Sequence, residues 1–355
     1  MARALTVSID AMGGDAGPSV VVSALLKAIQ RHTDVSFLLH GDEAGLAPLL
    51  ARQPRLQGRV TIIHAAERVR MEDKPSHVLR RGKDTSMWHA IDSVKRGEAS
   101  VAVSAGNTGA LMALSMFNLG IIEGISRPAI ATIWPTLKGQ TVVLDVGANV
   151  GATDEQLVDF AVMGEAFARA ILGLKQPSIG ILNVGSEEQK GNDGVKGAAQ
   201  ILRASNTPMN FHGFVEGDDI GKGTVDVVVT EGFAGNIALK TAEGTARQIG
   251  GYIREALKAD IVSMLGAAIA GQALQALRRK LDPRNINGGV FLGLNGVVIK
   301  SHGGTDEIGF KGALGLAYEM ARNRVMDKIA EGMRRFPTLN AAPAPAAAEP
   351  EAKPA

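Results

Sequence analysis

The segment LNVGSEEQKGND, residues 182–193, holds the densest group of side chains that could do chemistry. It follows an apolar run typical of a strand and crowds Glu187, Glu188 and Lys190 between two glycines. A lysine at a strand-to-helix turn is a compact charge that could neutralise a phosphate or an oxyanion. Loop solubility explains the charges but not their crowding, so we take Lys190 and Glu187 as candidate site residues.

Two further polar residues follow strand-like runs. Asn236, in EGFAGNIALK, comes after two glycines, and its amide could donate to a developing oxyanion, although helix capping is an equally simple explanation. His302, in KSHGG, lies between a VVIK strand and a glycine turn. We take it as a candidate substrate contact, with a purely structural role as the alternative.

Three more glycine-punctuated loops follow apolar runs: SIDAMGGDAGP (8–18), VSAGNTGA (103–110) and LDVGANVGATD (144–154). Such loops at the carboxyl ends of parallel strands can turn backbone N–H groups toward an anion. Turn and cap formation is the alternative reading of each polar residue in them. The candidate substrate-binding residues from these loops are Asp10, Gly13, Gly14, Asp15, Asn107, Thr108 and Asn149.

The elements around these loops alternate between short β-branched runs and longer helical patterns. This alternation favours a doubly wound α/β fold with a mostly parallel sheet covered on both faces. Pro18, and the trio Thr153, Asp154 and Glu155, are typical of helix starts directly after two of the loops. We expect one α/β unit over residues 1–336 and a disordered Pro/Ala-rich tail over 337–355.

Composition excludes several classes of function. The 355 residues contain no cysteine, which rules out disulfides, thiolate metal sites and a cysteine nucleophile. A formal net charge of +2 and 4% aromatic residues argue against nucleic acid as a partner. The dinucleotide fingerprint, the P-loop and the helix-borne zinc motif are all missing, which argues against each of those three kinds of site. The start of the chain does not read as a signal peptide, so we expect a cytoplasmic protein.

Residues 252–284 differ from the rest, because the uncharged run 261–277 lies between basic residues. This run is shorter and more polar than the roughly 20 apolar residues of a spanning helix. It predicts a helical hairpin whose tip contacts a lipid surface, or alternatively a buried core or dimer helix. The candidate membrane contacts are Ile261, Val262, Met264, Leu265 and Ile269.

Taken together, these segments resemble the PlsX family of bacterial acyl-[acyl carrier protein]:phosphate acyltransferases. The matching stretches include IDAMGGDAGP, RRGKDTSMWHAIDSVKRGEASVAVSAGNTGALMA, RPAIATIWPT, VLDVGANV, GILNVGSEEQKGND, FVEGDDI and VVTEGFAGNIALK. They cover the chain from about residue 5 to residue 330. Each stretch alone is a weak signal, whereas their combination is specific.

The resemblance implies a homodimer with the sheet architecture of isocitrate and isopropylmalate dehydrogenases and of phosphate acetyltransferases. It also implies that the enzyme needs no metal and no redox cofactor. It implies transfer of a long fatty acyl group from acyl carrier protein to inorganic phosphate, which yields acyl phosphate for phospholipid synthesis and for a downstream glycerol-3-phosphate acyltransferase. It assigns Lys190 to the phosphate and Asn236 to the acyl carbonyl. It also favours the membrane-contacting hairpin, and so peripheral association with the inner face of the membrane.

Acyl carrier protein is acidic, so it is expected to dock on a basic surface. One candidate cluster is Arg68, Arg70, Lys74, Arg80, Arg81 and Lys83, and another is Arg278, Arg279, Lys280 and Arg284. Three alternatives remain: a phosphate acetyltransferase-like enzyme that uses acyl-coenzyme A, a metal-dependent β-decarboxylating dehydrogenase and a non-enzymatic membrane-associated scaffold.

Overall fold

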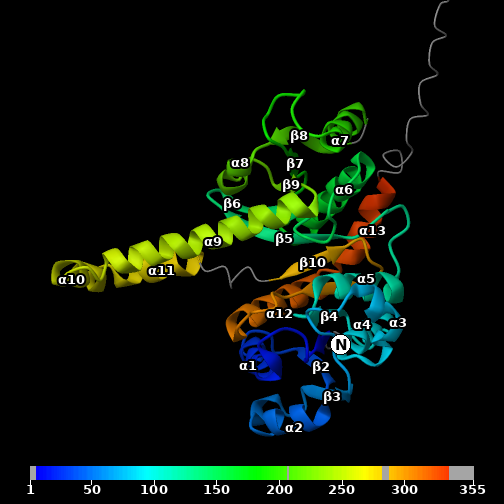
Figure 1. Ribbon diagram of the computed structural model, residues 1–355, viewed down its shortest axis with the longest axis vertical. Helices are drawn as coiled ribbons and strands as arrows, with labels where there is room; N and C mark the ends of the chain where they lie inside the picture. Colours follow the sequence, from blue (N-terminus) through cyan, green and yellow to red (C-terminus); the bar gives the residue numbers. More distant parts are fainter. Residues whose placement is uncertain (1–4, 206–207, 282–287, 336–355) are drawn as a thin grey trace, which may run out of the picture.

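The computed structural model describes residues 5–205, 208–281 and 288–335. In this part of the chain the strands form one 11-stranded sheet (Figure 1). From one edge to the other, the strands are β3 (Val60–His64), β2 (Val35–Gly41), β1 (Leu5–Asp10), β4 (Val101–Ser104), β11 (Val297–Lys300), β10 (Gly289–Leu292), β5 (Ala129–Thr136), β6 (Gly139–Leu144), β9 (Val227–Val229), β7 (Ser178–Leu182) and β8 (Asn210–Val215).

The sheet is mostly parallel, as the alternation of strands and helices predicts. Its antiparallel pairings, β11–β10, β10–β5 and β5–β6, lie together in the middle. They separate two parallel groups, β3-β2-β1-β4-β11 and β6-β9-β7-β8. The three antiparallel pairings make the two groups run in opposite directions, so the carboxyl ends of each group meet at that group's own edge, where its glycine-rich loops begin.

Both faces of the sheet are covered by helices, and successive strand residues divide between two cores. Val101 and Val103 pack into the larger core, whereas Ala102 between them packs into the smaller one. The helices of the larger core are α1 (Gly17–Ile29), α2 (Glu43–Ala51), α6 (Asp154–Ile171), α7 (Asp193–Ala204), α12 (Glu307–Arg322) and α13 (Val325–Arg335). Those of the smaller core are α3 (Pro75–Arg81), α4 (Ser86–Lys95), α5 (Thr108–Leu119) and α8 (Gly217–Lys222). Two short 3-10 turns, η1 (Pro54–Leu56) and η2 (Gly82–Asp84), complete these connections.

Local sequence sets where the helices after the loops begin. Thr153 caps α6 in a reciprocal capping box with Gln156, and Pro18 lies in the first turn of α1. Phe160 and Phe167 of α6 are fully buried. Burying a side chain of this size contributes about 1.5–3 kcal/mol relative to leaving it exposed. Caps and core contacts together fix the helix starts against the loops.

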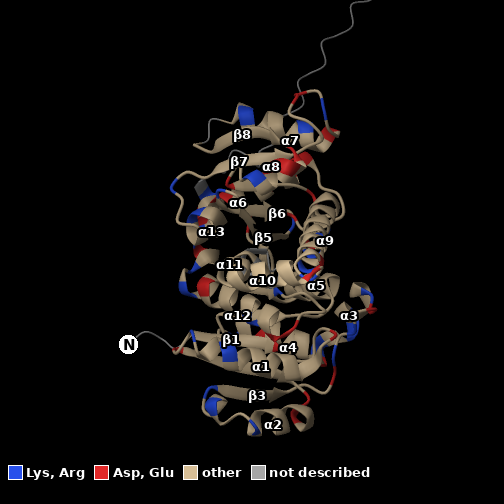
Figure 2. Cartoon of the chain, turned by 90° about the vertical axis from the view of Figure 1, so that its left-hand side faces the viewer, with Lys and Arg blue, Asp and Glu red and all other residues tan. Residues whose placement is uncertain are grey.

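The expected helical hairpin is present and projects from the sheet (Figures 1 and 2). It consists of the long helix α9 (Gly232–Ala256), the tip helix α10 (Ile261–Ile269) and the returning helix α11 (Gly271–Leu281). No helix in the described ranges is both long enough and apolar enough to cross a membrane. The expected tail over 337–355 and the basic residue Arg284 lie outside the described residues, as do the side chains of Arg278, Arg279 and Lys280.

Candidate functional site

Strand register lines up three polar residues at the carboxyl edge of the first parallel group. Asp10 on β1 pairs in register with Ser104 on β4, and Ser104 pairs in register with Lys300 on β11. Neighbouring strands lie about 4.8 Å apart, so the three side chains form a row on one face. Asp10 is buried and accepts hydrogen bonds from Ser104 Oγ at 2.7 Å and from Ser86 Oγ at 2.6 Å. Burial raises the pKa of Asp10, and the hydrogen bonds from the two serines oppose that rise.

The first loop can approach this row only because it contains glycine. A Cβ atom on Gly13 would lie 2.5 Å from Asp10 Oδ2, and one on Gly14 would lie 2.9 Å from Gly303 O. Gly14 also has a φ of +89°, which other residues rarely adopt. The Asp15 N–H donates to Gly303 O at 2.9 Å. The loops after β1 and β11 are therefore held against each other.

Asn107 is engaged in local structure. Its Oδ1 accepts from the Ala110 N–H at the start of α5, and its Nδ2 donates to Met71 O at 2.7 Å and Asp73 O at 3.1 Å. Thr108 is the first residue of α5. Asn107 therefore attaches the segment with the basic residues 68–74 to the carboxyl ends of the first parallel group.

A cationic cluster begins at Lys300, the third residue of this row. Lys300 is partly buried, and its Nζ donates to Ala105 O at 3.4 Å and also to Ser301 O. His302 follows two residues later, and its Nε2 contacts Lys240 Nζ from helix α9. Burial, and then the charge of Lys240, lower the pKa of Lys300 to about 8 and also lower the pKa of His302. His302 is therefore a neutral acceptor for the Lys240 ammonium near neutral pH.

At the second parallel group, a buried carboxylate organises the loop after β6. Asp145 is fully buried and accepts from four backbone N–H groups, those of Ile130, Gly147, Ala148 and Asn149. Burial raises the pKa of Asp145, and these hydrogen bonds oppose the rise. The Asn149 Nδ2 donates to Asp145 Oδ2 at 2.9 Å and Pro128 O at 2.8 Å. Asn149 is 3% exposed, so its amide supports the loop from the buried side and does not face solvent.

Asn236 lies against this loop. A Cβ atom on Gly147 would lie 2.7 Å from Asn236 Nδ2, which places the amide directly over the glycine. The cap of α9 is made by Glu231, which accepts from the Phe233 and Ala234 N–H groups and also from the Gly151 N–H. Capping therefore does not explain Asn236, and its amide remains a candidate oxyanion donor.

Helix α9 joins the two groups of loops. Asn236 and Lys240 lie one turn apart, and residues with this spacing share a helix face. Asn236 contacts the loop after β6, whereas Lys240 contacts His302 after β11. Glu243 adds a second link, since its Oε2 lies 3.4 Å from Lys240 Nζ and 3.8 Å from His302 Nε2.

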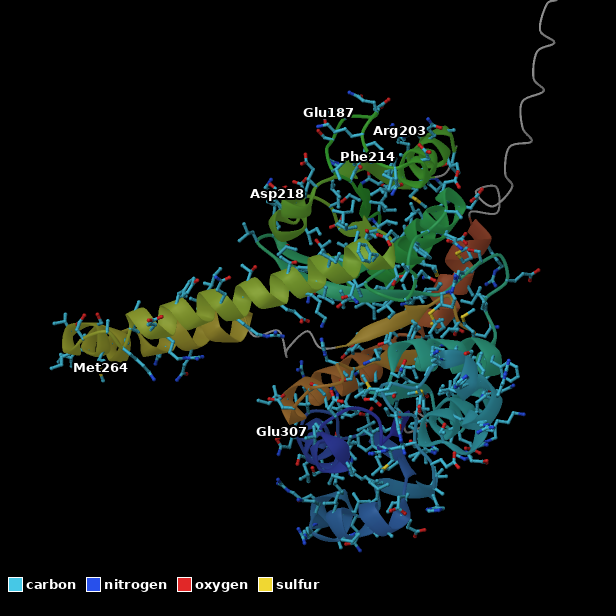
Figure 3. The ribbon with its side chains drawn as sticks, in the orientation of Figure 1. Glu187, Arg203, Phe214, Asp218, Met264 and Glu307 are labelled. Carbon is cyan, nitrogen blue, oxygen red and sulfur yellow. The ribbon has the colours of Figure 1, made fainter. Side chains whose placement is uncertain are left out.

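Lys190 forms a separate group. Its Nζ pairs with Glu187 Oε1 at 2.8 Å, and both side chains are nearly half exposed. The Asn183 Nδ2 holds the loop by donating to Lys190 O at 3.1 Å. Figure 3 shows Glu187 at the outer end of the second group of strands, away from the hairpin tip at Met264. In the described structure, Lys190 is thus brought together with Glu187 but not with Asn236.

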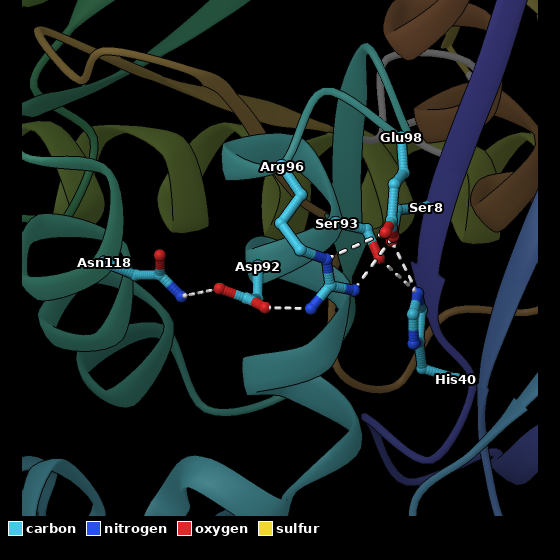
Figure 4. Close-up of polar contacts among 7 residues, drawn as sticks. All are labelled: Ser8, His40, Asp92, Ser93, Arg96, Glu98 and Asn118. Atoms are coloured by element: carbon cyan, nitrogen blue, oxygen red, sulfur yellow. Dashed lines mark hydrogen bonds and ion pairs between the residues drawn. The ribbon is translucent and has the colours of Figure 1, made fainter.

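Helix α4, which carries Ser86, is fixed by a second polar cluster (Figure 4). His40 Nε2 lies 2.9 Å from Ser8 Oγ and 3.4 Å from Ser93 Oγ at the far end of α4. Burial lowers the pKa of His40 to about 4, so the ring is neutral at physiological pH. The cluster positions the helix whose first residue binds Asp10.

Two hollows of about 430 and 500 Å³ lie toward the amino ends of the first parallel group, where Thr6 lines both. They contain no candidate residue and lack the converging glycine loops. We therefore place the candidate site where helix α9 links the loop after β6 to the loop after β11. Among the described residues, no three side chains of the types that bind metals come together.

Comparison with known proteins matches this architecture to a family. The family model for "Fatty acid synthesis protein" matches residues 5–328. A "Phosphate acyltransferase" of Azorhizobium caulinodans is 55% identical over 98% of this chain and 99% of its own length. One from Xanthobacter autotrophicus is 56% identical over 94% of each chain. The chain belongs to the PlsX family of phosphate acyltransferases.

Solved structures support the fold of this family member. A phosphotransacetylase from Streptococcus pyogenes matches with a TM-score of 0.58 and 17% identity, covering 94% of this chain and 95% of its own. A branched-chain phosphotransacylase from Enterococcus faecalis V583 matches with a TM-score of 0.56 and 14% identity, covering 89% and 99%. These likenesses confirm the predicted α/β architecture.

Several residues of the site escaped the sequence analysis. Lys300 closes a VVIK strand and Lys240 lies at the i+4 position after Asn236, so strand end and helical spacing were available signals. Ser86 carries no such signal, because it meets Asp10 only through the packing of α4 on the sheet.

Proposed function

We propose that the enzyme transfers a long fatty acyl group from acyl carrier protein to inorganic phosphate. The family fixes a phosphate acyltransferase, and the observation that carries the proposal is the position of Asn236 over the loop after β6. In this reaction a phosphate oxygen attacks the thioester carbonyl, the C–S bond breaks, and the phosphate proton passes to the departing thiolate. The products are acyl phosphate, a precursor for phospholipid synthesis, and free carrier protein.

The residue roles follow from charge and position. The Asn236 amide donates to the oxyanion that develops on the carbonyl. Lys190 neutralises negative charge as phosphate attacks, and Glu187 orients Lys190 through their ion pair. Because Lys190 lies in the loop after β7 and Asn236 lies in helix α9, both act together only when substrate bridges the two. Direct transfer also needs no enzyme nucleophile, which agrees with a chain without cysteine.

The basic segment beside the site supports docking of the acidic carrier protein. Met71 lies close to the loop after β11, since its Cε would lie 3.2 Å from a Cβ on Gly303. Basic residues surround it in the segment 68–74 and in α3, where Figure 2 shows blue positions. A carrier protein bound there would deliver its acyl thioester close to the glycine loops. The cluster is Arg68, Arg70, Lys74, Arg80, Arg81 and Lys83.

The hairpin supports membrane contact and dimer formation as further parts of the proposal. At its tip, Val262 is 79% exposed and Ile269 is 89% exposed, which is unusual for apolar residues of this size. Ile261, Met264 and Leu265 are exposed beside them. Along α9, Ile249 and Tyr252 are also uncovered, which favours a second subunit on that helix. Peripheral attachment would place the acyl phosphate near a membrane-bound glycerol-3-phosphate acyltransferase.

The proposal is tested by the choice of acyl donor. Purified enzyme is incubated with phosphate and either palmitoyl-acyl carrier protein or palmitoyl-coenzyme A, and acyl phosphate is measured. We expect a higher kcat/KM with the carrier protein, because only that donor contacts the basic segment. A reversed preference would replace the proposal by the acyl-coenzyme A alternative. Reversing the charge of Arg70 and Arg81 should raise KM for the carrier protein only.

A further inference from the structure

We propose that Lys300, Lys240 and His302 form the binding site for inorganic phosphate, and that Asp15 makes this site selective for phosphate over sulfate. The inference rests on the proposed function for its place in the reaction, but it concerns residues that neither the family match nor the motifs assign. It begins from the contact between Lys240 on α9 and His302 after β11.

Several side chains that can donate to an anion converge after β11. Strand register places Lys300 at the carboxyl edge beside Ser104, and His302 follows it in the same loop. Lys240 approaches from a different element, and its charge acts on both Lys300 and His302. Two ammonium groups held close together repel each other, and an anion between them relieves that repulsion.

The carboxylates of Asp10 and Glu243, which lie near the cluster, have partners other than Lys300. Asp10 directs its two oxygens to the hydroxyls of Ser86 and Ser104. Glu243 is shared among Lys240, Arg247 and His302. No carboxylate lies within ion-pair distance of Lys300 in the described residues, and its contacts are with two carbonyl oxygens. A partly buried ammonium without a carboxylate partner is suited to an anionic ligand.

Asp15 places a carboxylate beside the loop after β11. Its Oδ2 would lie 3.5 Å from a Cβ on Gly303 and 3.9 Å from one on Gly304, so the carboxylate faces the loop that carries His302. Near neutral pH inorganic phosphate retains at least one O–H, whereas sulfate has none. An ionised carboxylate only accepts hydrogen bonds, so Asp15 can accept from phosphate and repels sulfate.

Position along α9 connects this site to the acyl group. Lys240 lies one turn from Asn236 on the same helix face, at about 5–6 Å between neighbouring side-chain origins. Phosphate held by Lys240 is therefore beside the carbonyl that Asn236 polarises. Lys190 then acts on charge that develops during the attack, while the three residues of the cluster hold phosphate before it.

Protonation supports the assignment. Lys300 has a pKa of about 8, so it is partly neutral in weakly basic solution. The charge of Lys240 lowers this pKa, whereas Asp15 and Asp10 raise it. Within the described residues, His302, Glu243 and Arg247 are further titratable or charged groups around the cluster. A bound dianion favours the charged lysine, so phosphate binding takes up protons. Phosphate affinity should fall as pH rises above about 8 in the wild type.

The test is direct binding of inorganic phosphate and of sulfate by calorimetry to the full-length protein. The variants are Lys300→Met, Lys240→Met and Asp15→Asn, with Lys222→Met as the control, because Lys222 is an exposed lysine paired with Asp218 on α8. Loss of one charge-assisted contact should weaken phosphate binding by about ten- to a hundredfold. Asp15→Asn should abolish the preference for phosphate over sulfate, and Lys222→Met should change neither affinity.

Separate outcomes identify which idea fails. Phosphate binding within twofold of wild type in both lysine variants would overturn the phosphate site, and equal affinities of the wild type for phosphate and sulfate would overturn the role of Asp15. If Lys300→Met does not fold, Lys240→Met and Lys300→Arg carry the test, and Lys300→Arg should bind more tightly than a neutral variant. The same proteins are assayed with palmitoyl-acyl carrier protein. Phosphate binding without acyl transfer would overturn the proposed donor and leave the phosphate site standing.

Discussion

The Lys240 ammonium on α9 and the His302 imidazole after β11 are in contact, so one helix links the two groups of loops. The other end of this link is Asn236, one turn earlier, whose amide lies over Gly147. The helix thereby sets the separation between the proposed oxyanion donor and the proposed phosphate-binding cluster. Small displacements of α9 should consequently affect catalysis more than stability.

The packing of Asn236 on Gly147 gives a first prediction. In Gly147→Ala the new methyl would lie 2.7 Å from Asn236 Nδ2, so the amide must move. We expect kcat to fall by about a hundredfold, the scale of losing one oxyanion donor. Steady-state kinetics with saturating substrates measures the change.

Gly151→Ala is the matched control for this substitution. Gly151 also has a positive φ, +79°, but a Cβ atom there meets nothing within 4 Å. Gly151→Ala should lose about 1–2 kcal/mol of stability, because its φ lies near the left-handed region. Gly147→Ala, at a φ of +133°, should lose at least as much stability, and it alone should lose kcat. Equal kcat values for the two variants would show that the position of Asn236 is not critical.

Lys190 and Glu187 give a second prediction. Lys190→Ala should lower kcat by about a hundredfold or more, because it removes charge stabilisation in the transition state. Thermal unfolding should hardly change, since exposed ion pairs contribute little to stability. Glu187→Gln should cause a smaller loss of kcat, because it leaves the lysine present but no longer oriented. A Lys190→Ala enzyme with normal kcat would remove Lys190 from the catalytic residues.

The buried His40 predicts a dependence of stability on acid. Its pKa is about 4 in the folded protein, below the ordinary value of 6.5. Between these values the unfolded chain binds more protons than the folded one, so the free energy of unfolding falls as pH drops from 6.5 toward 4. His40→Gln should flatten this dependence in chemical denaturation, whereas replacing the exposed His212 by Gln should not. A wild-type stability that stays constant over this range would contradict the assignment of a neutral, buried ring.

The hairpin tip predicts a lipid effect that is separate from chemistry. Val262→Asp should weaken binding to anionic vesicles by about ten- to a hundredfold, the equivalent of losing one buried apolar side chain. Its kcat in the absence of vesicles should stay unchanged, because the tip is remote from the glycine loops (Figure 3). Gln275→Glu, which adds charge on the exposed surface of α11, serves as control. Identical vesicle binding by both variants would favour the tip as a protein contact.

Much of the fold follows from the sequence because its signals are local. Alternating elements predict the parallel sheet, and Thr153 and Pro18 predict two helix starts that the structure confirms. The antiparallel strands β5 and β10 in the middle were not foreseen, since antiparallel pairing there joins segments distant in the chain. Local patterns do not encode such pairings.

The site divides in the same way. Gly13, Gly14 and Asp15 were recognisable because a glycine-rich turn after a strand is a local signal, and the structure places them at the carboxyl edge. The partnership of Asp10 with Ser86, and of His302 with Lys240, depends on how helices α4 and α9 pack. Such contacts are set by tertiary packing and leave no local pattern in the sequence. The contacts of α9 bring the loops after β6 and β11 together in one candidate site.

The most direct measurement is the release of free carrier protein from purified palmitoyl-acyl carrier protein, with and without inorganic phosphate, by the wild type and by Lys190→Ala. The account predicts release that requires phosphate, occurs with formation of acyl phosphate, and is nearly abolished by the substitution. Release that does not need phosphate, or no release under either condition, would contradict acyl transfer from carrier protein to phosphate.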